Sequence, residues 1–473
     1  MAVAGNPSVV HCIAAAVRRY SVLVPQPTAQ PNAQPDPQPD AQPDPQPDAQ
    51  RGAVGSVLPR RRLLAAGGGL AAAAVLAACG SNTGRGGGSG GPGLAQWYHQ
   101  YGELGTEQAA RRYAGEYPRA RVTVQWRPGD YDQQTSAALL TDAGPDVFEY
   151  NGPTLDQIQG GQVVDLTDAI GGAASDFNPA VLGPKTYRGR VYGIPQTIDM
   201  QLLFYRRSLL DRAGVSPPGT LDELVAAARA LTTKDVKGLF LGNDGGAGAL
   251  GGTPLHAAGL ELVTPAGEVG FADPAAAAAL GKLHTLYADG SLLLGAPSDW
   301  SDPSALTQGL TAMQWTGLWA IPQVTKALGD DFGVLPFPPD GARGRPAVPV
   351  GAYASCVSAR SGQIQQATDF ARWLWVERTD LQEDFALSYG FHIPARLSLA
   401  RQAAKLRTGP AADAVGFATD HGHADPLLWT ARSKAALRDA LTRIISGGAD
   451  AATELAPVVD TVRAELARVR KPN

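Results

Sequence analysis

Aromatic side chains lie beside carboxylates or glycines at several places in this chain. The segment WYHQYGE, residues 97–103, combines aromatic rings with an imidazole and an acid, and Trp315, Gly317 and Trp319 form a second compact group. A pyranose ring exposes C–H faces that flat aromatic rings can cover. Its hydroxyls need polar partners once they are buried. These residue types therefore suit the binding of a neutral sugar.

The candidate ligand-contacting residues lie where predicted strands end and loops begin. They are Tyr98, His99, Glu103, Tyr150, Asn151, Asp199, Trp300, Trp315, Gly317, Trp319, Gly351, Tyr353 and Arg396. We expect one tryptophan of the second group to stack on the ligand, and choose Trp315. A glycine at 317 would let the ligand approach the backbone closely. Arg396 could place two hydrogen bonds on neighbouring hydroxyls, with an interlobe salt bridge as the alternative.

Each aromatic candidate also has a structural alternative, which is a place in a hydrophobic core. We expect Trp429 to be a core residue and Cys356, inside a strand pattern, to be a small buried hydrophobe. Asp146 precedes a strand at a turn, where its carboxylate is expected to accept backbone N–H groups. The set holds few basic residues, which argues against a phosphorylated sugar.

Composition excludes several other classes of protein. The chain has 473 residues and a net charge of −4, without a concentrated basic run, so nucleic-acid binding is not indicated. Three cysteines, Cys12, Cys79 and Cys356, do not make a disulfide framework. There is no metal-ligand spacing and no glycine-rich phosphate loop, so we expect no metal and no cofactor. A chain of this length suits two lobes.

Residues 60–78 predict an export signal that ends at a lipidated cysteine. Three arginines precede the apolar run from Leu63 to Ala78, which is short for a bilayer span. The sequence LAAC ending at Cys79 resembles a bacterial lipobox, and both Sec and twin-arginine export fit the segment. Residues 79–93 are rich in Gly and Ser and predict a flexible tether. We therefore expect a body held at the outer face of the cell membrane by lipid on Cys79.

The first 59 residues cannot contribute to a folded core. Residues 25–50 repeat PQPD and AQPD, a composition typical of a disordered extension. An export signal this far inside a chain is unusual, so an alternative is translation from a start near Val54 or Val57.

Strand and helix patterns alternate through the rest of the chain. Residues 94–98, 121–126, 146–150, 311–315, 332–335 and 352–358 predict strands, and residues 106–117, 131–142, 274–288 and 363–376 predict helices. Thr220 and Glu223 form a capping box before a further helix. This alternation predicts an α/β architecture with parallel sheets, and a cleft between two lobes is a usual place for a small ligand.

The order of several short motifs resembles one family, the family 1 extracellular solute-binding proteins of carbohydrate ABC importers, which have the type II periplasmic binding protein fold. The motifs are WYHQYG (97–102), AGPDVFEY (143–150), GGQVVDLTD (160–168), RGRVYGIPQTIDMQLLFYRRSLLDRAGVSPPGTLDEL (188–224), AMQWTGLWAIP (312–322), VLPFP (334–338), VGAYASCVS (350–358) and YGFHIPAR (389–396). Each is weak alone, but together they cover nearly all of residues 94–473.

The resemblance implies two lobes with a hinge and an interlobe cleft. We expect residues 94–198 and 347–378 in the first lobe, and residues 199–346 and 379–473 in the second. It implies a monomer that binds a mono- or oligosaccharide by hinge closure, because the ligand stabilises the closed form. It also implies delivery to ABC transporter permease subunits and no catalysis. The alternatives are an exported glycosidase, with Glu103 and Asp199 as its acids, and an adaptor that signals ligand occupancy to a receptor.

Overall fold

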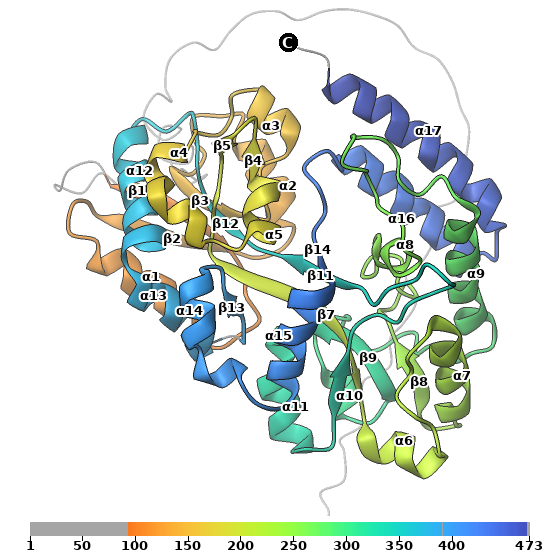
Figure 1. Cartoon of the computed structure of the whole chain (residues 1–473). Helices are drawn as coiled ribbons and strands as arrows, with labels where there is room; N and C mark the ends of the chain where they lie inside the picture. Colours follow the sequence, from red (N-terminus) through yellow and green to blue (C-terminus); the bar gives the residue numbers. More distant parts are fainter. Residues whose placement is uncertain (1–92, 390, 471–473) are drawn as a thin grey trace, which may run out of the picture. The chain divides into compact units, whose positions relative to one another are not determined.

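The structure is a computed structural model that describes residues 93–389 and 391–470. The predicted extension, export signal, lipidation site at Cys79 and tether, up to residue 92, lie outside the described residues. No helix within the described ranges is long and apolar enough to cross a membrane. The described residues form a mixed α/β fold with two main sheets, each covered by helices (Figure 1).

The first sheet carries the amino-terminal strands in the order β2-β1-β3-β12-β6. Its strands are β1 (Leu94–His99), β2 (Val122–Arg127), β3 (Val147–Tyr150), β6 (Ile194–Pro195) and β12 (Ala354–Val357). The first three are parallel, as expected, but β12 runs antiparallel to both β3 and β6. The carboxyl ends of β1 and β3 therefore lie next to each other at one edge of the sheet.

The second sheet is built around β7, which pairs with four other strands. Its strands are β7 (Thr197–Tyr205), β8 (Lys237–Phe240), β9 (Thr311–Gly317), β10 (Gly333–Leu335), β11 (Val348–Gly351), β13 (Ile393–Pro394) and β14 (Gly422–His423). All four partners run antiparallel to β7, so the prediction of parallel sheets is wrong here. A short hairpin of β4 (Thr186–Tyr187) and β5 (Arg190–Val191) stands apart.

Two chain segments connect the sheets side by side. Strand β6 leads directly into β7, and β11 leads into β12, so each segment contributes to both sheets. Asp199 on β7 pairs with Gly351 on β11. This antiparallel pairing explains the mixed sheets, because one segment leaves the first lobe where the other returns to it. Figure 1 shows both segments running through the centre of the described residues.

The helices follow the expected periodic segments closely. The longer ones are α1 (Thr106–Glu116), α2 (Tyr131–Ala138), α6 (Arg207–Ala213), α7 (Leu221–Leu231), α9 (Pro274–Ala288), α11 (Ile321–Leu328), α12 (Ile364–Arg372), α13 (Thr379–Asp384), α14 (Leu397–Gln402), α15 (Gly409–His421), α16 (Ala431–Ile445) and α17 (Ala451–Val469). The short ones are α3 (Leu155–Gln159), α4 (Thr167–Ile170), α5 (Pro179–Leu182), α8 (Thr253–Ala257) and α10 (Ser304–Thr307). Thr220 caps α7 by accepting from the N–H of Glu223, while the Glu223 carboxylate takes the N–H of Gly219 rather than that of Thr220.

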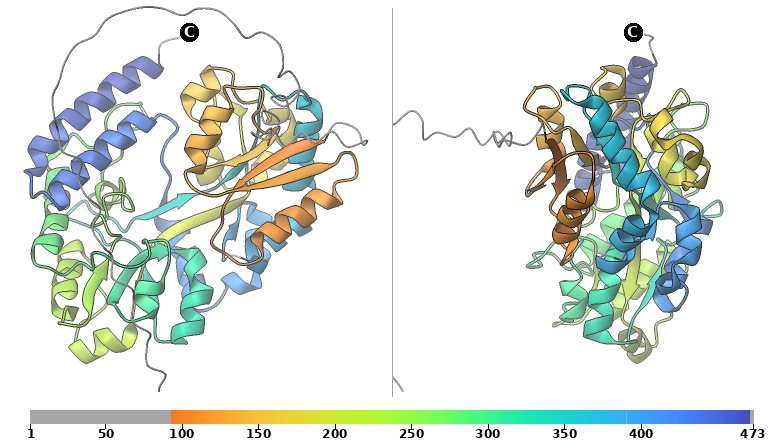
Figure 2. Two further views of the ribbon diagram at one scale, coloured as in Figure 1. Left: turned by 180° about the vertical axis from the view of Figure 1, so that it is seen from behind. Right: turned by 90° about the vertical axis from the view of Figure 1, so that its left-hand side faces the viewer.

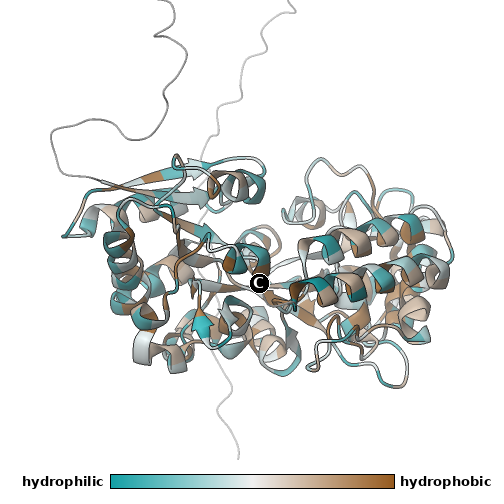
Figure 3. Cartoon of the chain, turned by 90° about the horizontal axis from the view of Figure 1, so that it is seen from above, coloured by the Kyte–Doolittle hydropathy of each residue, from teal (hydrophilic) through white to brown (hydrophobic). Residues whose placement is uncertain are grey.

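Two hydrophobic cores support the two lobes. Tyr98, Phe370 and Phe385 belong to the first, whereas Leu280 and Trp315 belong to the second. In Figure 3 the strands inside each lobe carry hydrophobic residues, and the outer helices alternate between polar and apolar faces.

Helices α13 and α14 pack on the first lobe. The Tyr113 hydroxyl on α1 donates to Asp384 at 2.6 Å, and the Phe385 ring meets that of Trp375 edge-on. Helices α16 and α17 pack in the second core instead, on the far side of the crossing strands in both views of Figure 2. The assignment of all residues 379–473 to the second lobe is therefore wrong for the segment that holds α13 and α14.

An ion pair joins the lobes away from the crossing strands. Arg468 on α17 donates to both carboxylate oxygens of Asp156 on α3, at 2.7 and 3.0 Å. The Gln159 amide donates to the carbonyl of Val469 nearby. These contacts hold the described residues with the two lobes touching on this side.

Candidate ligand-binding cleft

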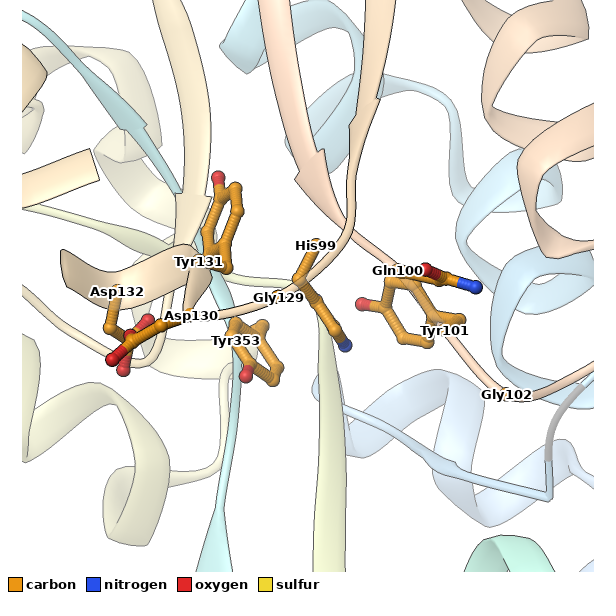
Figure 4. A pocket seen from close by; sticks show the side chains of 9 residues that line it. All are labelled: His99, Gln100, Tyr101, Gly102, Gly129, Asp130, Tyr131, Asp132 and Tyr353. Carbon is orange, nitrogen blue, oxygen red and sulfur yellow. The ribbon is translucent and has the colours of Figure 1, made fainter. Parts of the chain in front are cut away.

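A hollow of about 440 Å³ opens where the first sheet meets the crossing strands. It is lined by His99, Gln100, Tyr101, Gly102, Gly129, Asp130, Tyr131, Asp132 and Tyr353. Figure 4 shows the side chains of His99, Tyr101 and Tyr353 together in this hollow, with Asp130 and Asp132 towards one end. Strand β1 and the loop after it supply four of these residues, because the chain turns out of the sheet after His99.

Glu149 organises the floor beneath this hollow. It lies on β3 and is fully buried, so its carboxylate must be satisfied by the protein. One oxygen accepts from the backbone N–H of His99 at 2.7 Å and contacts the His99 ring. The other oxygen accepts from the Tyr101 hydroxyl at 2.8 Å and from the side-chain amide of Gln196 at 3.2 Å. Glu149 therefore positions His99 and Tyr101 rather than facing a ligand.

His392 joins two further carboxylates, Glu103 and Asp199. Its Nε2 lies 3.2 Å from Glu103, and its Nδ1 contacts Asp199 on β7. The imidazole is buried, whereas Glu103 and Asp199 keep 16% and 23% of their side chains exposed. Two partly exposed carboxylates thus share one buried imidazole at the crossing strands.

The pKa values of both histidines are raised by these carboxylates. Burial disfavours the charged form of His392, but Asp199 and Glu103 outweigh it and raise its pKa to about 10. Burial also opposes the charge on His99, and Glu149 outweighs it, so the pKa of His99 is raised. The pKa of the Glu103 carboxyl is lowered, because the hydrogen bond and charge of His392 outweigh the effect of burial. Near neutral pH the imidazole of His392 is therefore charged.

Stacked rings form a second feature of the hollow. The rings of His99 and Tyr353 stack with centroids 4.3 Å apart, and the ring of Tyr101 lies 3.9 Å from that of His99. The hydroxyl of Tyr131 donates to the carbonyl of Glu149 at 2.7 Å, which holds that ring against β3. The rings therefore present flat surfaces next to the carboxylates.

Trp319 follows β9 and is a half-buried tryptophan that packs against the first hydrophobic core. Gly317, two residues before it, pairs with Gln201, which is two residues after Asp199 on β7. The Trp319 indole is half-buried and meets the ring of Trp300 edge-on at 5.9 Å. Its N–H donates to the carbonyl of Ser301. The register of the sheet thus places Gly317 close to Asp199 along β7, and Trp319 and Trp300 contact each other beyond it.

Asn151 and Gly351 also meet at the crossing strands. A Cβ on Gly351 would stand 3.7 Å from the Asn151 side-chain oxygen, and Gly351 pairs with Asp199. Tyr150, one residue earlier, is buried and its hydroxyl bonds that of Ser136 at 2.8 Å. The structure therefore brings together His99, Glu103, Asn151, Asp199, Gly351 and Tyr353, whereas Tyr150 supports them from within the sheet.

Three expected ligand residues occupy other positions. Tyr98 is fully buried, because alternation along β1 turns it to the side opposite His99. Trp315 is fully buried as well, and its indole N–H donates to Gln201, so the choice of Trp315 as the stacking tryptophan is wrong. Arg396 is engaged by Asp176 at 2.9 Å and by the carbonyl of Val376, so it forms a salt bridge within the first lobe and not between the lobes.

The role expected for Gly317 is also corrected. A Cβ at this position would stand 2.0 Å from the Trp319 ring, so the glycine makes room for an indole of the protein and not for a ligand. Other structural expectations are confirmed: Asp146 accepts from the N–H of Ala95 at 2.8 Å, and Trp429 packs in the second core. Cys356 is buried, and burial raises the pKa of its thiol to about 12.

Glu149, His392 and Asp132 were not predicted as part of the site. Glu149 reads as a polar residue inside a strand, and only its complete burial gives it a role. His392 lies in the motif YGFHIPAR, far from Asp199 in sequence, and nothing local indicates that they meet. Asp132 lies in α2, and nothing in the sequence of that helix indicates that it faces the hollow. Burial raises the pKa of its carboxyl.

A second hollow, of about 540 Å³, shares no lining residue with the first. His256 and His423 stack there with centroids 3.8 Å apart, and none of their ring nitrogens has a hydrogen-bond partner among the described residues. None of the expected ligand residues lies there.

The model of one protein family, described as bacterial extracellular solute-binding protein, matches residues 92–375. This match covers more than half of the chain. The chain belongs to this family. The matched region includes β1, β3, both crossing segments and Trp319, and so most of the candidate cleft.

Two curated relatives are similar in sequence to parts of this chain. The melibiose/raffinose/stachyose-binding protein MelE of Bacillus subtilis is 28% identical over 129 residues, which cover 26% of this chain and 29% of MelE. A probable ABC transporter-binding protein of Deinococcus radiodurans is 23% identical over 66% of this chain and 77% of its own length.

Solved structures of other solute-binding proteins share the fold. The GacH receptor of Streptomyces glaucescens, solved unliganded and with acarbose, has a TM-score of 0.68 at 23% identity, over 79% of this chain and 98% of GacH. A Thermotoga lettingae solute-binding protein bound to α-D-tagatose has a TM-score of 0.68 at 19% identity, with 79% and 99% coverage. UgpB of Mycobacterium tuberculosis, in complex with glycerophosphocholine, has a TM-score of 0.66 at 20% identity, with 80% and 99% coverage. These likenesses establish the two-lobed periplasmic binding protein fold.

Proposed function

We propose that this protein is the sugar-binding subunit of an ABC importer, held outside the cell membrane by lipid on Cys79. Family membership supports a solute-binding role. The names of MelE, GacH and the tagatose-binding protein associate this fold with saccharides. The cleft of this chain has the chemistry that such ligands need.

One observation carries the proposal, which is the meeting of exposed carboxylates and aromatic rings at the crossing strands. Glu103 and Asp199 keep oxygens accessible, and the stacked rings of His99 and Tyr353 lie in the adjoining hollow. Carboxylates accept hydrogen bonds from sugar hydroxyls, and ring faces cover sugar C–H groups. A mono- or oligosaccharide satisfies both kinds of surface at once.

Ligand binding would couple to closure because both lobes contribute to the cleft. His99 and Glu103 follow β1 of the first lobe, Trp319 follows β9 of the second, and Asp199 lies on the segment between them. A saccharide that contacts all three parts binds the closed form more tightly than the open form. It therefore shifts the population towards closure, and the closed shape is what the permease subunits would recognise.

The proposed role is binding without catalysis. Glu103 and Asp199, the acids of the glycosidase alternative, both contact His392, an arrangement that suits hydrogen bonding to hydroxyls. We propose that the protein acts as a monomer. Incubation with oligosaccharides should release no new reducing ends.

A thermal-shift screen of the purified protein against neutral mono-, di- and trisaccharides tests the function. A ligand that binds only the native state raises the melting temperature in proportion to ln(1 + [L]/Kd). We expect at least one saccharide to raise it in a concentration-dependent way. The variant Asp199→Ala should lose this shift, whereas Asp211→Ala, an exposed acid on α6, should keep it. No shift with any saccharide would contradict the proposal.

A further inference from the structure

The carboxylates of the cleft outnumber the cations that face them. Glu149 is matched by His99, but Glu103 and Asp199 share the single imidazole of His392. Even if both imidazoles carry a charge, one of these three carboxylates is left uncompensated. Asp130 and Asp132 add further negative charge at the rim of the hollow.

The uncompensated charge is accessible to a ligand. Among the described residues, no donor other than His392 bonds the side chain of Asp199, and the bond goes to Oδ1. Its Oδ2 is left for a ligand, on a side chain that is 23% exposed. Glu149, in contrast, is fully buried and receives several hydrogen bonds.

Among the described residues, no lysine or arginine lines the hollow, and His99 is its one basic residue. Arg127, whose strand runs beside β1, stacks its guanidinium on Trp97 and donates to Gln125 and Gln134. The charge of Lys434 partly opposes the rise that burial causes in the pKa of the Asp132 carboxyl, but Lys434 forms its ion pair with Asp425, at 2.8 Å. Lys185 is buried and donates to the carbonyl of Asn151. The cleft therefore keeps a net negative charge.

We propose that the cleft selects saccharides that carry a protonated amine over their neutral counterparts, and rejects acidic ones, with Asp199 as the main residue that sets this preference. The inference rests on the proposed function and narrows its ligand class. An ammonium group donates three hydrogen bonds. It also supplies the second positive charge that Asp199 and Glu103 need, because the two carboxylates share one imidazole. Partial burial strengthens this attraction relative to bulk water. A ligand carboxylate or phosphate would meet the same charges as repulsion.

Matched sugars test the inference by isothermal titration calorimetry at about pH 6, where amines are protonated. The probes are glucose, glucosamine and glucuronate, and galactose, galactosamine and galacturonate. We expect the amine to bind at least about tenfold more tightly than the neutral sugar on the ring that the protein accepts, and the acid to bind more weakly than both. The preference should shrink as salt is raised, because the charges are partly exposed.

The variant Asp199→Asn separates charge from hydrogen bonding. It retains an acceptor oxygen but loses the charge, so we expect its affinity for both sugars to fall, and that for the amine to fall by at least about tenfold more than that for the neutral sugar. Asp211→Asn, on the exposed face of α6, should leave the preference unchanged. A neutral sugar that binds as tightly as its amine, or an amine preference that survives in Asp199→Asn, overturns the inference while the sugar-binding function stands. If none of the six probes binds, the inference is overturned. If the thermal-shift screen is negative as well, the proposed sugar-binding function is also contradicted.

Discussion

The indole of Trp319 lies directly over the backbone of Gly317, so that a Cβ at Gly317 would stand 2.0 Å from the ring. The backbone at Gly317 is extended, with φ −104° and ψ 167°, a conformation that any residue adopts. The absence of a side chain, and not an unusual backbone angle, is therefore what the structure requires here. The position of the Trp319 ring depends on that absence.

Replacing this glycine should weaken ligand binding. In Gly317→Ala the added methyl group displaces the Trp319 ring, and we expect the affinity for the preferred saccharide to fall at least about fivefold, or 1 kcal/mol. Gly281→Ala is the matched control, because that glycine lies in α9 with open space around its Cβ position. The control should keep its affinity and gain about 0.5–1 kcal/mol of stability from helix propensity. Equal affinity in both variants would contradict the role of Trp319.

The two tryptophans of the QWTGLW segment should separate stability from binding. Trp315 is buried and donates to Gln201 at 2.9 Å, so Trp315→Phe should lower the free energy of unfolding by about 1–3 kcal/mol. Its sugar affinity should change little. Trp319→Ala should instead lower the affinity by about tenfold or more with a smaller effect on unfolding. Urea titrations and calorimetry on both variants distinguish these effects, and the reverse pattern would show that Trp315 faces the ligand.

The charge on His392 predicts a pH-dependent contribution to stability. Its pKa is raised from an unfolded value of about 6.5 to about 10. The folded protein therefore binds the proton more tightly, and this stabilisation is complete below about pH 6.5 and is lost as the pH rises through about 10. The difference in unfolding free energy between the wild type and His392→Gln should be largest near pH 6 and should shrink towards pH 10.

The partner carboxylate offers a control for this prediction. In Asp199→Asn one cause of the raised pKa is removed, so the contribution of His392 should fall at a lower pH. Urea unfolding of the single and double variants at several pH values checks this. A difference between wild type and His392→Gln that does not vary with pH would show that His392 is not charged in the folded protein.

The stacked histidines of the second hollow predict the opposite dependence. Burial lowers the pKa of His256 and, with the charge of His256, that of His423, although Glu261 and Asp425 partly oppose the shift of His256. The unfolded chain then takes up protons that the folded chain does not, so stability falls as the pH drops below about 6.5. His256→Leu should reduce this loss, because leucine removes a buried polar group that has no partner.

A second histidine serves as the comparison for that variant. His284 bonds the carbonyl of Ile445 at 2.9 Å, so His284→Leu should lose a hydrogen bond and destabilise the protein by about 1 kcal/mol. Unfolding free energies at about pH 5 and pH 7 measure both effects. A loss of stability in His256→Leu that is as large at low pH as at neutral pH would contradict the unpaired state of His256.

Local sequence patterns predicted most elements of the fold. The helix over residues 274–288 is found as α9 with those bounds, and the strand pattern of residues 94–98 is found as β1. The direction of β7 and β12 was not predictable in this way, because it depends on which strands pair across the crossing segments. The packing of α13 on the first lobe likewise depends on the tertiary contact between Asp384 and Tyr113.

The candidate site was predicted in part for a similar reason. His99, at the end of β1, can be found from local order, since a strand that leaves a sheet exposes its last side chains. Asp199 was expected where a strand ends but lies inside β7. The choice between Trp315 and Trp319 could not be made in this way, because both fit the same segment, and only their burial, complete for Trp315 and partial for Trp319, shows which indole is the more exposed. His392 meets Asp199 across 193 positions of sequence, a contact that no local pattern contains.

Calorimetric titration of the wild type and of Asp199→Ala with the saccharide that gives the largest thermal shift tests the account most directly. We predict saturable binding of one saccharide per chain to the wild type, and a loss of at least about tenfold in affinity, or 1.4 kcal/mol, in the variant. The same affinity for both proteins, or no heat of binding with any saccharide, would contradict the assignment of this cleft to sugar binding.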